Sequence, residues 1–159
     1  MSCLKKFAAG LFMALATNAT VAAADDQETV QIFYDLLNNP GSEPHTAAFL
    51  EATAEGWVST GDYSVKTKSR DAFVGQMGGF AKLIPDLEWT VQDMYQDGDT
   101  VVVRSRAIGT PAGPLFGVDG EGRGFDILTI DIHKLEGCVI VQSYHVEDRA
   151  GAMRQFSSK

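Results

Sequence analysis

The stretch from Gly124 to Asp148, which reads GFDILTIDIHKLEGCVIVQSYHVED, decides the fold. Apolar and polar residues alternate on both sides of Glu136-Gly137, and this pattern predicts two antiparallel strands joined by a tight turn. Successive side chains point to opposite faces of a strand, so a turn centred on Gly137 places Asp131 and His145 on one face. In that register the two residues are diagonal neighbours, about 7–8 Å apart at the backbone. A shift of one residue would move His145 to the other face.

The first 24 residues have the pattern of a secretory signal peptide. Lys5 and Lys6 precede a short apolar run, and small residues ending at Ala24 precede two acidic residues. Such a segment is too short to cross a bilayer, and it is removed on export. The sequence therefore predicts cleavage near Ala24 and a periplasmic or secreted product that covers residues 25–159.

The remaining 159 − 24 = 135 residues suffice for one domain with a proper core. Removal of two lysines changes the net charge to −8 − 2 = −10. An acidic domain of this kind is not expected to bind nucleic acid or an anionic membrane surface. Cys138 is the single cysteine left, so no internal disulfide is expected, and we interpret it as a small buried residue.

Hydrophobic periodicity predicts helices first and strands afterwards. The expected helices cover residues 26–38, 43–55, 69–83 and 148–155. The expected strands cover residues 87–95 and 100–109 and the two arms of the hairpin, while residues 56–65 are irregular or a short strand. Helices segregated from a curled, four-stranded antiparallel sheet make an α+β domain. Three glycines weaken the third helix, at positions 75, 78 and 79, and mark either close packing or a flexible lid.

With this order of elements, the chain resembles the SnoaL-like polyketide cyclase (ester cyclase) family of the NTF2-like superfamily. The resemblance covers the chain from residue 25 onward by order of elements, and its specific part runs from Ile84 to Phe156. The matching pieces are Ile84-Pro85-Asp86-Leu87, Asp97-Gly98-Asp99, Gly109-Thr110, Leu115-Phe116-Gly117-Val118, Gly122-Arg123, Ile130-Asp131-Ile132 and the segment from Tyr144 to Arg149.

This resemblance implies an NTF2-like cone, in which N-terminal helices pack on a curved antiparallel sheet around an apolar interior. It also implies acid–base chemistry without a cofactor, typically an intramolecular aldol ring closure. The family pairs a His on the penultimate strand with an Asp on the last one. The matching positions here are Asp131 and His145, so the two residue types are exchanged and their individual roles stay open.

Asp131 and His145 are the predicted catalytic residues, because proton removal beside a carbonyl needs a base and a group that holds the enolate oxygen. Either of them suits the base, and a structural hydrogen bond between them is the competing interpretation. The candidate substrate-binding residues are Trp57, Phe73, Met77, Phe80, Trp89, Arg104, Phe116 and His133. Arg104 suits either an anion clamp or an outer-face ion pair. A metal site formed by Asp131, His133 and His145 is the less favoured reading, and no metal is expected.

Three functions follow from this pattern. The first is an exported acid–base enzyme, a cyclase or isomerase that acts on a small hydrophobic carbonyl compound. The second is an exported small-molecule-binding protein without catalysis. The third is an association module in which a sheet face forms a homodimer and side chains fill the interior. A fold alone does not decide among them.

Overall fold

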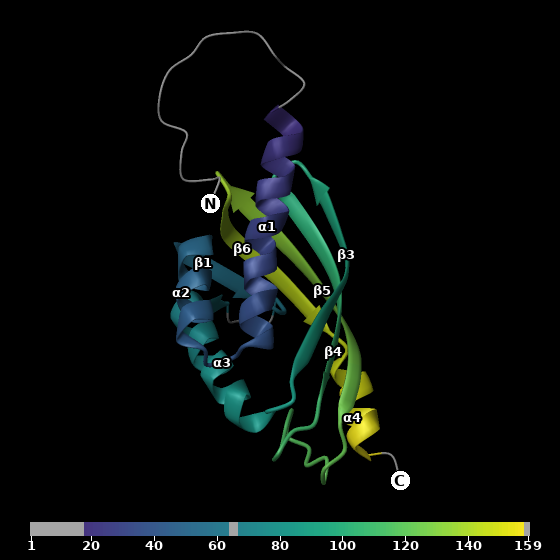
Figure 1. Ribbon diagram of the computed structural model, residues 1–159. Helices are drawn as coiled ribbons and strands as arrows, with labels where there is room; N and C mark the ends of the chain where they lie inside the picture. Colours follow the sequence, from purple (N-terminus) through teal and green to yellow (C-terminus); the bar gives the residue numbers. More distant parts are fainter. Residues whose placement is uncertain (1–17, 64–66, 158–159) are drawn as a thin grey trace, which may run out of the picture.

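The computed structural model describes residues 18–63 and 67–157, with side-chain burial from residue 25 onward (Figure 1). The predicted signal segment, residues 1–24, lies largely outside this range, and its last residues begin the first helix. No helix in the described part of the chain is long and apolar enough to cross a membrane.

Four helices and a six-stranded sheet make up the described chain, which confirms the α+β fold class. The helices are α1 (Asn18–Asn38), α2 (Glu43–Ala52), α3 (Arg70–Leu83) and α4 (Arg149–Ser157). The strands are β1 (Thr53–Thr60), β2 (Lys68–Ser69), β3 (Glu88–Asp97), β4 (Thr100–Gly109), β5 (Phe125–Glu136) and β6 (Val139–Glu147). Their order in the sheet is β2-β1-β6-β5-β4-β3. Helices α1, α2 and α3 lie on one side of the curved sheet, and α4 lies at the lower end of the sheet in the view of Figure 1.

The sheet differs from the predicted antiparallel meander by two strands. Strand β1 pairs in parallel with β6, and β2 pairs with β1. Helix α2 ends at Ala52, earlier than predicted, because Thr53 takes an extended conformation and begins β1. The parallel pairing joins residues more than 80 positions apart, as in Val58 and Gln142. Local periodicity carries no information about such a distant partner.

The hairpin has a different register from the predicted one. Its turn consists of Gly137 and Cys138, both with positive φ (59° and 64°), as a two-residue type I′ turn requires. This turn alone would place His145 on the face opposite Asp131. A bulge between the pairs Lys134–Gln142 and Leu135–Ile140 restores the parity, and Asp131 lies directly opposite His145. Cys138 is half-buried at the turn rather than buried in the sheet.

Aromatic side chains fill the space between the helices and the sheet. Phe33 of α1 stacks on Phe73 of α3 at 5.1 Å between ring centroids, and Phe49 and Trp57 meet edge to face at 5.5 Å. The end of α1 is fixed to the edge strand β3, because the Asn38 amide exchanges two hydrogen bonds with the backbone of Trp89. This core holds α1 and α3 at a fixed distance from the inner face of the sheet.

Two glycines of contrasting environment allow a test of this packing. Gly109→Ala is expected to lower the free energy of unfolding by about 1–3 kcal/mol, because the new Cβ would lie 2.5 Å from Cγ2 of Ile84. Gly75→Ala is expected to raise it by up to about 1 kcal/mol, since no atom lies within 4 Å and the residue is inside α3. Urea unfolding of both variants measures the difference. Equal effects would contradict the packing described for Gly109.

A Cβ added at any of the three glycines of α3 would meet no atom within 4 Å, so these glycines do not serve close packing.

Candidate functional site

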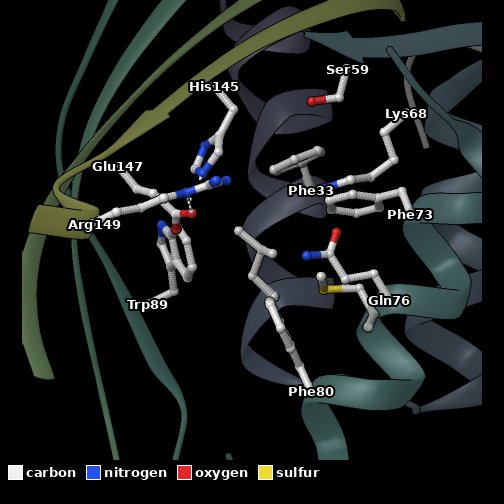
Figure 2. Close-up of a pocket in the computed structure, with 12 residues that line it drawn as sticks. Phe33, Ser59, Lys68, Phe73, Gln76, Phe80, Trp89, His145, Glu147 and Arg149 are labelled. Atoms are coloured by element: carbon white, nitrogen blue, oxygen red, sulfur yellow. Dashed lines mark hydrogen bonds and ion pairs between the residues drawn. The ribbon is translucent and has the colours of Figure 1, made fainter. Parts of the chain in front are cut away.

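A cavity lies between α1 and α3 on one side and β3 and β6 on the other (Figure 2). Its volume is about 50 Å³, and the empty space of the hollow, including its open mouth, is about 490 Å³. The apolar lining consists of Phe33, Leu37, Phe73, Met77, Phe80 and Trp89. The polar lining consists of Ser59, Lys68, Gln76, His145, Glu147 and Arg149. An apolar cavity with a few convergent polar groups is the usual form of a small-molecule binding site.

Asp131 and His145 form a close pair beside this cavity. Their positions face each other across β5 and β6, and His145 Nδ1 lies 2.7 Å from Oδ1 of Asp131. The Asp131 side chain is 1% exposed and does not line the cavity, whereas His145 does. His145 is therefore the member of the pair that a ligand can touch, and Asp131 stands behind it.

A directed chain of hydrogen bonds ends on Asp131. The indole Nε1–H of Trp57 can only donate, and it donates to Oγ of Ser143 at 3.0 Å. Tyr34 donates its single hydroxyl proton to Oδ2 of Asp131 at 3.0 Å, so its oxygen accepts from Nε2–H of His133 (3.2 Å). Nδ1 of the neutral His133 then accepts from Oγ of Ser143 (2.9 Å). All members are buried, and each bond points toward the carboxylate, so the chain fixes the position of the Asp131 side chain.

His145 lies between two carboxylates. Its Nε2 is 3.5 Å from Oε2 of Glu147, whose other oxygen accepts a hydrogen bond from Nε of Arg149 at 2.9 Å. Burial lowers the pKa of His145, but the hydrogen bonds to Asp131 and Glu147 outweigh it and raise the pKa to about 9. Burial raises the pKa of Glu147, and contacts with His145 and Arg149 reverse this and hold it below its ordinary value. At neutral pH the cavity therefore presents an imidazolium beside an ionised carboxylate.

His133 has the opposite electrostatic character. It is fully buried, and burial lowers its pKa to about 4, although the charge of Asp131 partly opposes this shift. Both ring nitrogens are engaged, by Tyr34 and Ser143, which directs them away from a shared metal position. Within residues 18–63 and 67–157, no group of three His, Cys, Asp or Glu side chains is arranged to hold a metal ion.

Four of the eight predicted substrate-binding residues line the cavity, namely Phe73, Met77, Phe80 and Trp89. The other four lie elsewhere, and each position has a physical reason. Trp57 is 1% exposed in the aromatic core, and His133 is buried on the inner face of the sheet beneath the aromatic rings of α1. Arg104 is on the outer face, where its Nε donates to Asp93 at 2.7 Å. Phe116 lines a smaller adjoining cavity of about 20 Å³, which shares Phe80, Trp89 and Glu147 with the first.

Sequence reasoning missed five polar residues of the cavity, namely Ser59, Lys68, Gln76, Glu147 and Arg149. Glu147 directly precedes the cap of α4, which is Asp148, whose Oδ1 accepts from the backbone N–H of Gly151 at 2.7 Å. The alternation of β6 was sufficient to find Glu147, since it shares the face of His145. Lys68, Gln76 and Arg149 have no local signal, because they come from a two-residue strand and from helices that the fold brings together.

The two buried histidines predict a maximum of stability near pH 6.5. His145 binds its proton more tightly in the folded state, so its contribution is complete below pH 6.5 and is lost as the pH rises toward 9. His133 stays neutral in the folded state, so stability falls as the pH drops from about 6.5 toward 4. Urea unfolding at a series of pH values measures both slopes. Asp131→Asn is expected to flatten the alkaline slope, and an unchanged slope in that variant would contradict the role of the pair.

The sequence from residue 28 to residue 156 matches the family model of the SnoaL-like polyketide cyclases. The chain belongs to this family. The match covers every strand and most of the four helices, so the predicted resemblance is confirmed. A search of curated proteins found no match.

Solved structures share the SnoaL-like fold at low sequence identity. TsrD from Streptomyces laurentii superposes with a TM-score of 0.73 at 22% identity, covering 86% of this chain and 97% of TsrD. IdmH from Streptomyces antibioticus, a proposed polyketide cyclase, gives 0.70 at 23% identity, with 84% and 99% covered. A proposed SnoaL-like polyketide cyclase from Jannaschia sp. CCS1 gives 0.75 at 20% identity, with 94% and 99% covered. At these identities the likeness concerns the fold alone.

Proposed function

We propose that this SnoaL-like protein is an acid–base enzyme of the cyclase or isomerase type, which removes a proton beside a carbonyl group of a small hydrophobic substrate. The observation that supports it best is the presence of an imidazolium and a carboxylate, His145 and Glu147, side by side on the wall of an apolar cavity. Enolisation needs these two groups together, one to accept the α-proton and one to stabilise the oxygen.

The positions and charges favour a division of roles. His145 is protonated at neutral pH and lines the cavity, and its Nε2–H exchanges the long 3.5 Å contact with Glu147 for a hydrogen bond to the substrate carbonyl, which stabilises the enolate. Glu147 is ionised and lines the same wall, so it accepts the α-proton. Asp131 is shielded behind His145 and acts as a positioning residue, which the chain through Tyr34 and His133 holds in place. The protein needs no cofactor for this step.

The size of the cavity bears on the substrate. A volume of about 50 Å³ holds a few water molecules, so a ring compound would also occupy the open mouth of the cavity. Phe80, Trp89 and Glu147 line both this cavity and the adjoining one that Phe116 and Leu115 line. The two adjacent apolar spaces suit a flat, one- or two-ring carbonyl compound.

The proposal is tested by α-proton exchange in 1-tetralone, a bicyclic ketone. The wild-type protein in D₂O is expected to accelerate loss of the C2 proton signals above the rate in buffer, measured by proton NMR. Binding of 1-tetralone without acceleration would overturn the enzymatic function and favour a binding protein.

We further propose that the protein is exported, on the pattern of Lys5, Lys6 and the small residues before Asp25. Mass spectrometry of the protein from its native cell envelope or medium is expected to find an N-terminus at Asp25. Recovery of the uncleaved chain from the cytoplasm would contradict export.

A further inference from the structure

The wall of the cavity opposite His145 and Glu147 carries two polar groups, the ammonium group of Lys68 and the side-chain amide of Gln76. Lys68 of β2 and Gln76 of α3 face the sheet wall across the hollow, and Figure 2 shows the Gln76 amide directed into the space between the walls. Oε1 of Gln76 is buried and has no hydrogen-bond partner. The ammonium group of Lys68 contacts the face of Phe73, 5.7 Å from the ring centroid, and has no ion-pair partner within residues 18–63 and 67–157.

The charges around the cavity do not balance. Three cationic side chains line it, those of Lys68, His145 and Arg149. Two carboxylates accompany them, that of Glu147 in the lining and that of Asp131 behind His145. Asp131 and Glu147 both contact His145, and Glu147 also contacts Arg149, so these four residues neutralise one another. Lys68 is the cation left over, since 3 − 2 = 1.

Burial makes this excess charge costly. The cavity side of Lys68 is apolar, and desolvation lowers its pKa from the ordinary value, with attraction to Glu147 opposing the shift. An ammonium group that is half-buried, as that of Lys68 is, loses part of its hydration, and a bound anion relieves that cost. The Gln76 amide adds direction to such a site, because its N–H₂ end donates to an anionic oxygen, whereas the unpartnered Oε1 is an acceptor and does not itself bind the anion.

We propose that Lys68 and Gln76 form a carboxylate subsite opposite His145, so that the substrate is a hydrophobic keto acid whose carbonyl and carboxylate groups are held on opposite walls. A single carboxylate neutralises the one excess charge, whereas a phosphate dianion would exceed it. This inference rests on the proposed function for the carbonyl end, but the anion subsite stands on Lys68 and Gln76 alone.

The test compares 1-tetralone with 6-carboxy-1-tetralone, which has the same rings and ketone and adds a carboxylate away from it. Isothermal titration calorimetry of the full chain is expected to show binding of the acid about tenfold tighter or more. Lys68→Met is expected to reduce this preference to about one, Lys68→Arg to keep most of it, and Gln76→Leu to reduce it in part. Lys82→Met, at the exposed end of α3, is the matched control.

Two outcomes would overturn the subsite, namely an acid that binds the wild type no tighter than the ketone does, and a preference that survives in Lys68→Met. The same titrations with proton exchange recorded in parallel separate the two proposals. A strong preference for the acid without exchange would refute the catalytic function and leave the subsite intact. Exchange without a preference for the acid would refute the subsite and leave the catalytic function intact.

Discussion

His145→Gln is expected to lower the rate of α-proton exchange in 1-tetralone by about 10²-fold or more, while the fold is retained. Glutamine keeps a polar side chain of similar reach opposite Asp131, but it carries no charge at any pH. The side chain of His145 is 23% exposed and lines the cavity, so the substitution buries no new polar group. Proton NMR in D₂O measures the rate, and circular dichroism measures the fold.

The matched control for this variant is His45→Gln. His45 lies in α2, away from the cavity, and its Nδ1 contacts Oγ of Ser42 at 2.8 Å. It is expected to leave the exchange rate unchanged. If His145→Gln exchanged the ketone as fast as the wild type, the imidazolium would have no part in the reaction, and the close pair with Asp131 would be structural.

The fold class and the shared face of Asp131 and His145 were readable from the sequence because strand alternation is a local property. Strict alternation would put Ile140 on the face opposite His145, whereas the structure buries Ile140 in the core, opposite Leu135. The reason is the bulge at Val141, between the pairs Leu135–Ile140 and Lys134–Gln142. The extra residue of the bulge restores the parity of faces that the two-residue turn changes, and no periodicity in the sequence indicates such a bulge. The predicted parity was right for His145, and the predicted register was not.

The opposite wall of the cavity was not predictable by the same means. Phe73, Met77 and Phe80 were found because they repeat at helical spacing on α3. Lys68 and Gln76 are polar residues in the same region, and polarity in a helix normally indicates a solvent-exposed face. These two side chains face the cavity only because β2 pairs with β1 and α3 follows β2 directly. A site whose residues come from two separate walls can therefore be identified only in the tertiary structure.

Glu147→Gln is expected to lower the exchange rate at neutral pH by about 10²-fold or more, because the amide cannot accept the α-proton. The side chain keeps its shape and its hydrogen bond from Arg149. Glu136→Gln, at the exposed end of β5, is the matched control and is expected to exchange at the wild-type rate. The measurement is the same NMR assay, with the thermal midpoint of each variant recorded to exclude unfolding.

The pH dependence of the wild-type rate decides between the two candidate bases. If Glu147 accepts the proton and charged His145 stabilises the enolate, the rate is constant around neutral pH and falls as the pH rises through about 9, where His145 loses its proton. If neutral His145 were the base, the rate would instead rise with pH up to about 9. A rising profile together with an unimpaired Glu147→Gln variant would transfer the base to His145. The falling profile follows from the two carboxylates that flank this imidazole, since they keep it charged in the range where the reaction runs.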